Sequence, residues 1–187
     1  MNHFKTLLLT FTCVLGCTRM AVAQDTNALR TQIGVMEART GSVIVKGIGQ
    51  LGSLPLGVAE LDVKYKETVD AGGNQKVYGL AIDLEGGNFP RSRVLVDDDE
   101  LDALIDGVNY LAKIRNDVTT LPALEATYTT KAGLTIIADA IRREGAIVYY
   151  VQTCDSPRIG IAPVQMTQLA NLLQQGRKNL DALKAGK

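Results

Sequence analysis

The residue types that most often carry catalysis are scarce in this chain. His3 is the only histidine, it lies near the amino terminus, and the chain has no tryptophan. If the leader discussed below is removed, no imidazole remains for Ser-His-Asp or Cys-His catalysis, for general acid–base work or for zinc ligation. We therefore expect no catalytic residue of these classes, no metal ligand and no cofactor. Paired carboxylates stay possible, although carboxylate sites on sugars usually include aromatic walls.

A glycine pattern offers a possible nucleotide site. Gly47, Gly49 and Gly52 match G-x-G-x-x-G and follow the strand-like residues 43–45. A dinucleotide site requires the last glycine to open a helix, and Pro55 soon after it interrupts any helix. The pattern therefore predicts a strand end, a bulge or a close backbone approach rather than a cofactor site.

Acidic residues form a run at 97–100, followed by Asp102. Several carboxylates can hold calcium, but the run lacks the alternating spacing and the internal glycine of an EF-hand loop. Negative charge at the start of a helix explains the run instead. We expect Asp97 to be the N-cap of a helix over 98–115, with Glu100 completing a capping pair.

Cys154 is the one cysteine outside the expected leader, since Cys13 and Cys17 both fall within it. In an oxidising compartment a single thiol is either a buried apolar group or an exposed group that can pair with another chain. No histidine or lysine stands beside it in sequence to lower its pKa. This neighbourhood favours the buried, inert alternative.

Tyrosines and arginines are the remaining candidates for a binding surface. Tyr65 and Tyr128 fall in expected strands, and Arg143 belongs to an Arg-Arg pair. If one face of each sheet is uncovered, these three side chains are our candidate ligand-binding residues. The alternative is that the tyrosines are ordinary strand residues and that Arg91 and Arg93 are solvated edge positions.

The elements that must position these residues follow one order twice. Four strand-like segments come first, at 42–49, 57–69, 75–85 and 91–96. Glycine-rich turns separate the second segment from the third and the third from the fourth. Helical spacing follows over 98–115. The order then repeats, with strands at 124–131, 134–141, 146–152 and 158–161 and a helix over 163–183. Apolar and charged residues alternate in 57–69, which indicates that one face of the sheet is exposed to solvent.

When the second copy is aligned with the first at an offset of 65 residues, the ends of the two copies match. Met166 then falls on Leu101, and Leu169 falls on Leu104. We therefore predict an α+β fold of two tandem ββββα repeats, 42–118 and 119–187, after a polar segment at 24–41. In each repeat a helix covers one face of an antiparallel sheet. This element order over 42–183 is similar to that of the whirly-type and PUR-type single-stranded nucleic-acid binders. No diagnostic motif supports the resemblance, which therefore bears on fold alone.

Residues 1–23 have the three parts of a secretory signal peptide. Lys5 gives a positive start, 6–16 are mostly apolar, and the small residues 21–23 form a cleavage site. We expect cleavage between Ala23 and Gln24 and a periplasmic or secreted product. The alternative is a lipobox that ends at Cys17, which would anchor the chain to a membrane through a lipidated cysteine.

The expected cleavage removes two basic residues and no acid, which leaves 18 basic and 20 acidic residues. This balance argues against a nucleic-acid partner held by bulk electrostatics. We expect an exported, non-catalytic binding or interaction domain of the cell envelope, whose partner is an unidentified envelope protein or a small ligand. The alternatives are a carboxylate- or lysine-based enzyme and an envelope assembly subunit.

Overall fold

The computed structural model describes residues 30–87, 89–140 and 145–186. The expected signal peptide, both expected processing sites and Arg143 lie outside these residues. The first half of the chain contains a short helix, four strands and a second helix: α1 Gln32–Glu37, β1 Ile44–Leu56, β2 Ala59–Asp70, β3 Gln75–Gly86, β4 Phe89–Asp97 and α2 Leu101–Ala112. The second half contains a single 3-10 turn, four strands and a long helix: η2 Asn116–Val118, β5 Leu124–Thr129, β6 Thr135–Ala140, β7 Val148–Gln152, β8 Ile159–Ile161 and α3 Pro163–Lys184.

The strands form two antiparallel four-stranded sheets, ordered β1-β2-β3-β4 and β5-β6-β7-β8. This confirms the predicted α+β fold of two ββββα repeats. The structure adds α1 inside the segment that we expected to be merely polar, and it shortens the second helix to Leu101–Ala112. Among the described residues, no helix is long and apolar enough to cross a membrane.

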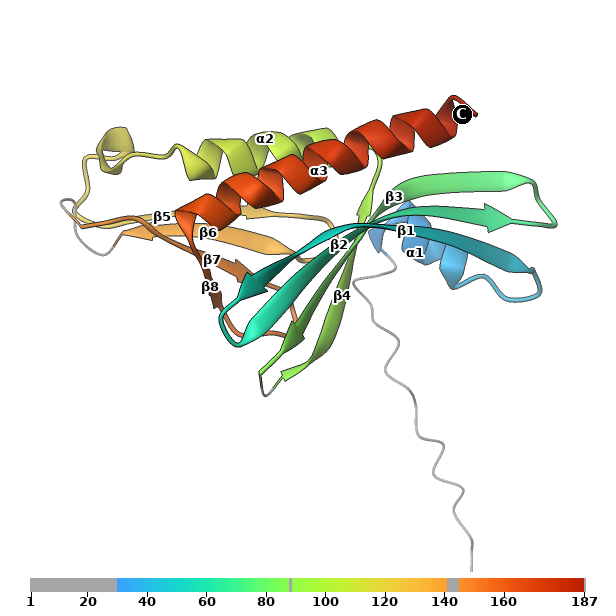
Figure 1. Cartoon of the computed structure of the whole chain (residues 1–187), viewed down its shortest axis with the longest axis horizontal. Coiled ribbons are helices and arrows are strands. Elements are labelled where there is room, and N and C mark those ends of the chain that lie inside the picture. Colours follow the sequence, from blue (N-terminus) through green and yellow to red (C-terminus); the bar gives the residue numbers. More distant parts are fainter. Residues whose placement is uncertain (1–29, 88, 141–144, 187) are drawn as a thin grey trace, which may run out of the picture.

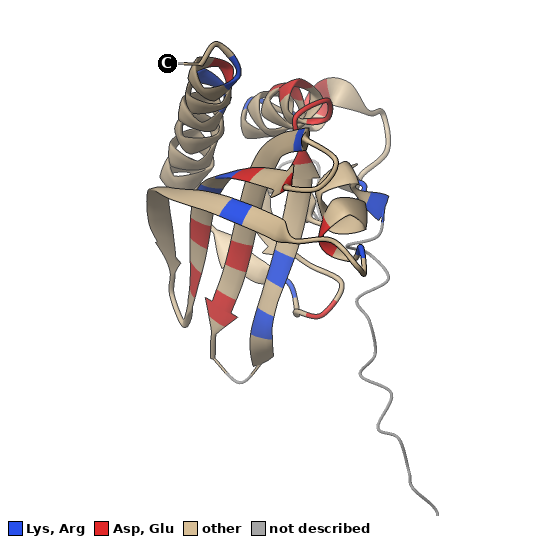
Figure 2. Ribbon diagram, turned by 90° about the vertical axis from the view of Figure 1, so that its right-hand side faces the viewer, with Lys and Arg blue, Asp and Glu red and all other residues tan. Residues whose placement is uncertain are grey.

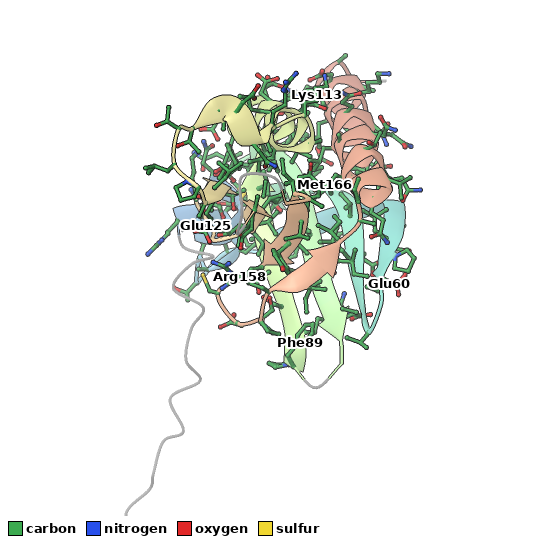
Figure 3. All side chains as sticks on the ribbon, turned by 90° about the vertical axis from the view of Figure 1, so that its left-hand side faces the viewer. Glu60, Phe89, Lys113, Glu125, Arg158 and Met166 are labelled. Carbon is green, nitrogen blue, oxygen red and sulfur yellow. The ribbon has the colours of Figure 1, made fainter. Side chains whose placement is uncertain are left out.

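The two sheets share one hydrophobic core. Alternation along β2 places Leu61 and Val63 in that core, fully buried, while Glu60 and Asp62 point to the other face. The same core contains Leu104 of α2 and Leu169 of α3, both with 0% exposure. Met166, near the start of α3, is equally buried and is labelled in Figure 3.

Each helix covers the sheet of the other repeat. The main contacts of α3 with strands are to β1, β2 and β3 of the first sheet, whereas those of α2 are to β5 and β6 of the second. The two helices also pack on each other, and Figure 1 shows them side by side above both sheets. The repeats are therefore interlocked, because each sheet packs its apolar face mainly against the helix of the other repeat.

The acidic run does not cap α2, so the expectation for Asp97 was wrong. The helix begins at Leu101, and its N-cap residue Glu100 makes no capping hydrogen bond. Asp97 instead accepts the backbone N–H groups of Gln32 and Ile33, at 2.7 and 3.2 Å, at the start of α1.

The other acids of the run bind other parts of the chain. Asp98 pairs with Arg177 and Lys184 of α3, at 2.7 and 2.9 Å. Asp99 pairs with Lys131, at 2.8 Å, in the turn between β5 and β6. The run thus connects α1, α3 and the second sheet at one junction.

The glycine pattern has a packing explanation. A β-bulge interrupts the pairing of β1 with β2 between Gln50 and Gly52, which confirms the expected bulge. A Cβ atom at Gly49 would lie 2.1 Å from the ring of Tyr65, and one at Gly52 would lie 2.9 Å from Leu172 of α3. Both glycines therefore allow a close approach of side chains to the backbone of β1.

Candidate functional site

The two candidate tyrosines lie on different sheets and on faces that contribute to the core. Tyr65 of β2 shares a face with Leu61 and Val63, and its ring covers Gly49. Tyr128 of β5 packs against α2, where its ring covers Gly107. Both tyrosines are partly buried against the core. The structure does not bring these two side chains together, and Arg143 lies outside the described residues.

The close packing of Tyr128 on Gly107 gives a prediction. A Cβ atom at Gly107 would lie 2.4 Å from Cδ2 and 2.7 Å from Cγ of Tyr128. Alanine favours a helix over glycine by about 1 kcal/mol, but overpacking typically costs about 1–3 kcal/mol. We expect Gly107→Ala to lower the melting temperature (Tm). Adding Tyr128→Ala should reverse the sign of the glycine substitution, and a Gly107→Ala protein with unchanged Tm would contradict the packing role.

Cys154 is exposed, contrary to the expectation that it is buried. The residue follows β7 in a turn, where Thr153 and Ser156 are buried. Its sulfur lies close to Gly133, which has a positive φ of 88° and would place a Cβ atom 2.4 Å from that sulfur. A side chain at position 133 would therefore collide with the exposed thiol.

The most organised polar arrangement lies on the face of the first sheet that turns away from α2 and α3, which we call the outer face. Helix α1 packs on β2, β3 and β4 and covers one part of this face. We call the uncovered part the open half. It consists of alternate residues of β2, β3 and β4. The charged residues of the open half are Glu60, Asp62, Lys64, Asp83, Glu85, Arg91 and Arg93. Figure 2 shows the acidic and basic bands on neighbouring strands.

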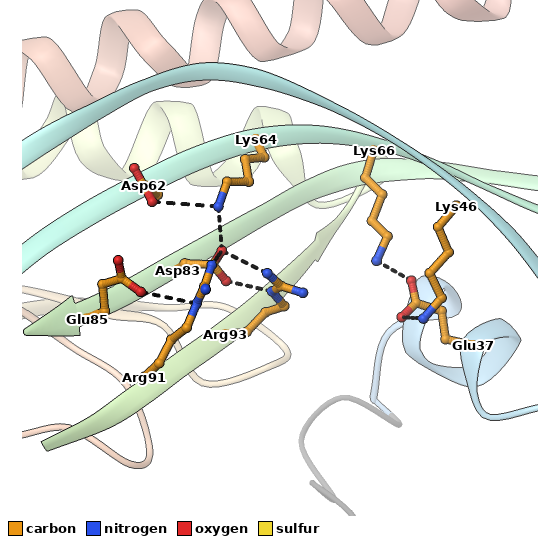
Figure 4. Close-up of polar contacts among 9 residues, drawn as sticks. All are labelled: Glu37, Lys46, Asp62, Lys64, Lys66, Asp83, Glu85, Arg91 and Arg93. Atoms are coloured by element: carbon orange, nitrogen blue, oxygen red, sulfur yellow. Dashed lines mark hydrogen bonds and ion pairs between the residues drawn. The ribbon is translucent and has the colours of Figure 1, made fainter.

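Asp83 is the centre of the open half. Its carboxylate has 0% exposure and accepts hydrogen bonds from three cationic side chains. Lys64 Nζ lies 2.7 Å from Oδ2, Arg91 Nη2 lies 2.5 Å from Oδ2, and Arg93 Nε lies 2.6 Å from Oδ1. A second bond from Arg93 Nη2 to Oδ2, at 2.9 Å, makes that pair bidentate. Figure 4 shows these contacts.

The network keeps Asp83 ionised. Burial of the carboxyl group raises its pKa, but hydrogen bonds from Arg93, Lys64 and Arg91 oppose that effect, and the net pKa lies far below the ordinary value. Arg91 and Arg93 keep 48% and 46% of their side-chain surface exposed. The arrangement thus presents two positioned guanidinium groups to the outside, each anchored on a rigid strand.

Removing the central carboxylate gives a second prediction. Breaking a buried ion pair costs about 3–5 kcal/mol, and we expect about 2 kcal/mol for Asp83→Ala because the arginines stay half in water. The control is Asp117→Ala, since Asp117 holds Arg115 with both side chains exposed, and its loss should change stability by under about 1 kcal/mol. Equal effects of the two substitutions in urea unfolding would contradict the network.

The pH dependence of this effect has a definite sign. A carboxyl group whose pKa is lowered by folding contributes stability above its unfolded pKa, and that contribution disappears as the pH falls toward its folded pKa. The unfolded pKa of aspartate is about 3.9. The difference in unfolding free energy between wild type and Asp83→Ala should therefore be constant above about pH 5 and shrink as the pH falls below about 4.

A separate ionic contact fastens α1 to the outer face. Glu37 of α1 forms ion pairs with Lys46 of β1, at 2.8 Å, and with the buried Lys66 of β2. Burial raises the pKa of the Glu37 carboxyl group, but hydrogen bonds from Lys46 and Lys66 outweigh it and the net pKa is lowered. The part of the outer face under α1 is therefore a structural contact.

Glu100 is the one carboxyl group of the described chain whose pKa is clearly raised. Burial is the main cause, opposed by a hydrogen bond from the backbone N–H of Lys131 at 2.6 Å. Its Oε2 atom is buried and has no hydrogen-bond partner within the described residues. A buried carboxyl group of raised pKa is the chemistry that the carboxylate-enzyme alternative requires.

The raised pKa predicts a stabilising substitution. A carboxyl group whose pKa is raised by folding destabilises the protein once the pH exceeds its unfolded pKa. Glu100→Gln should therefore stabilise the protein at neutral pH by about 1 kcal/mol, and the gain should vanish below about pH 4. The exposed Glu60 provides the control, because Glu60→Gln should change Tm little at either pH. A loss of stability in Glu100→Gln at neutral pH would contradict the assignment.

Sequence reasoning missed Asp83 and treated Arg91 and Arg93 as solvated edges. The three residues gather because Asp83 lies directly opposite Arg93 in the β3–β4 pairing and Lys64 lies on the adjacent strand, opposite Ala81. The available signal was the isolated Asp83 within the apolar run of β3, flanked by Ile82 and Leu84. A charged residue inside an apolar strand needs a partner when it is buried.

Comparisons with protein-family models, with curated proteins and with solved structures find no match for this chain. The similarity of element order to whirly-type and PUR-type repeats therefore stays a resemblance of topology, with no matching structure to support it.

Proposed function

We propose that this chain is an exported, non-catalytic interaction domain of the cell envelope that binds a partner protein through the open half of the outer face. The observation that carries the proposal is the Asp83 network. A fully buried carboxylate holds Arg91 and Arg93, both half exposed, on an uncovered sheet surface. Arginine is enriched at the energetic centres of protein interfaces.

Positioned arginines favour binding for a physical reason. Ordering a long side chain at an interface costs about 0.5–1.5 kcal/mol, and the bonds to Asp83 impose much of that order beforehand. Glu60, Asp62 and Glu85 add negative charge beside the positive pair. A surface on which positive and negative charges lie side by side favours a partner whose charges are arranged in the opposite order. Partners with a different charge pattern are disfavoured, because like charges would meet in the interface.

The network also separates this proposal from the enzyme alternative. Lys64, the one lysine among the charged residues of the open half, is held by Asp62 and Asp83 at 3.6 and 2.7 Å. Both contacts hold the ammonium group inside the network, whereas a lysine nucleophile must be free to reach its substrate. The arrangement suits recognition better than covalent catalysis.

Export is the first part of the proposal to test. The amino-terminal sequence of the protein recovered from a Gram-negative host should begin at Gln24, in the periplasmic fraction. A lipidated chain that begins at Cys17 and fractionates with membranes would instead support the lipoprotein alternative. A chain that begins at Met1 in the cytoplasm would refute export.

Binding is tested with arginine substitutions on and off the open half. Envelope proteins captured by wild type should be lost from Arg91→Ala/Arg93→Ala and kept by Arg115→Ala, since Arg115 is exposed and pairs with Asp117 instead of Asp83. Each variant must show an intact circular dichroism spectrum. Equal capture by all three proteins would place the site elsewhere, and turnover of a substrate by wild type would refute the non-catalytic function.

A further inference from the structure

Strand β1 is a long strand at an exposed edge of the first sheet. It contains 13 residues and pairs with β2 alone. An edge strand has unpaired backbone groups along one side, and proteins usually protect such an edge with prolines, bulges, charges or a covering element. The two halves of β1 differ in this protection.

The second half is protected. The bulge between Gln50 and Gly52 breaks the regular edge, and Pro55 lacks an N–H group. The Gln165 side chain of α3 donates a hydrogen bond to the carbonyl group of Pro55. Strand β8 also contacts β1, and Figure 1 shows it near the β1–β2 turn.

The first half, residues 44–50, has little protection. Lys46 is its only charged residue, and the ion pair with Glu37 at 2.8 Å binds that charge to α1 of the same chain. Val45 and Ile48 are 52% and 54% exposed. A Cβ atom at Gly47 would meet nothing closer than 3.8 Å, so no neighbouring side chain crowds the strand there. Helix α1 makes its main contacts with β2, β3 and β4 rather than with this edge.

We propose that residues 46–50 pair antiparallel with the same segment of a second copy of this chain, about a two-fold axis that passes between the two Ile48 residues. In this register Ile48 lies opposite Ile48 of the second copy, Gly47 lies opposite Gly49, and Lys46 lies opposite Gln50. The two exposed isoleucines bury each other, and no like charges meet.

Neighbouring registers are less favourable. An axis at Lys46 would place the two lysines opposite each other, which destabilises a strand pair. An axis at Gly47 would place each Lys46 opposite an isoleucine. An axis at Val45 would extend the pairing beyond the start of β1 at Ile44. The Ile48 register keeps the pairing inside the strand and uses the largest exposed apolar side chain of this segment.

The interface is small, because one pair of short strand segments buries less than the roughly 1,200 Å² of a standard stable complex. The dimer should therefore form reversibly and depend on protein concentration. It would join two first sheets into one continuous sheet of eight strands, with two Asp83 networks on its outer face. The proposal does not depend on the identity of the envelope partner.

Sedimentation velocity of the purified protein, in reducing buffer and over a wide range of concentration, tests the dimer. Wild type should shift from monomer to dimer as concentration rises. Ile48→Lys should stay monomeric, because it places two ammonium groups at the axis. Val58→Lys is the matched control at an exposed β-branched residue outside the proposed interface, and it should dimerise as wild type does. A wild type that stays monomeric, or an Ile48→Lys protein that dimerises normally, would overturn the proposal.

Cross-linking tests the register. In a Cys154→Ser background, Ile48→Cys should form a covalent dimer on mild oxidation, because the two sulfurs face each other across the axis within disulfide reach. Val45→Cys should cross-link far less, since its counterpart lies several residues away along the strand. Efficient cross-linking of Val45→Cys, or none of Ile48→Cys, would refute this register.

Discussion

Leu169→Asp and Leu104→Asp are each expected to destabilise the protein by about 5 kcal/mol, enough to unfold many domains. Both leucines have 0% exposure and belong to the one core that the two sheets share. Each substitution loses apolar burial and places an unpaired charge in that core. The effects should be similar although the helices belong to different repeats.

Leu121→Asp is the matched control for these substitutions. Leu121 is 66% exposed, so its replacement should change the unfolding free energy by less than about 0.5 kcal/mol. Thermal or urea unfolding measures all three variants. If Leu169→Asp melted at the wild-type temperature, α3 would not be part of the core, and the crossed arrangement of helices would be wrong.

Deletion of α3 is expected to unfold the first sheet, although that sheet belongs to the first repeat. A chain that ends before Pro163 lacks the helix that packs on β1, β2 and β3, and it would expose Leu61, Val63 and Leu80 to water. Burial of one such side chain contributes about 1.5–3 kcal/mol. We expect the truncated chain to show no cooperative unfolding transition.

Hydrogen exchange distinguishes this outcome from a fold in which each repeat covers its own sheet. In the crossed arrangement the amides of β1–β3 lose protection when α3 is removed. In an uncrossed arrangement they would keep protection under α2, so persistent protection of the first sheet would contradict the structure. A chain that lacks only residues 185–187 should melt as wild type does.

The order of strands and helices was predictable because apolar residues recur in the sequence with the spacing of strands or of helices. In β2 the alternation of Leu61 and Val63 with Glu60 and Asp62 fixes both the strand and its two faces. In α3 the spacing of Met166, Leu169 and Leu173 marks one apolar side, and Pro163 marks the first helical turn. These are local signals, and local structure follows them.

The crossing of the helices and the role of the acids were not predictable in this way. The apolar sides of α2 and α3 are chemically alike. The sequence of either helix alone therefore does not indicate which sheet it covers. Asp97 stands where a helix N-cap is expected, yet it binds the backbone of α1, 65 residues away. Long-range partners of this kind are set by the folded topology, which a pattern within one segment does not contain.

The candidate site shows the same limit. Tyr65 and Tyr128 were selected as exposed strand residues, but Gly49 and Gly107 are their packing partners across the fold. Asp83 could be noticed as one charge in an apolar strand. Its assembly with Lys64 and the two arginines depends on strand register, which sets which residues face each other.

The most direct test of the proposed interaction surface is site-specific photo-cross-linking in the periplasm of the host. A photoreactive residue in place of Glu60, on the open half, should form a covalent adduct with a discrete envelope protein. The same residue in place of the exposed Lys113, at the end of α2, should not; both positions are labelled in Figure 3. An adduct from Lys113 with none from Glu60, or equal adducts from both, would contradict binding through the open half.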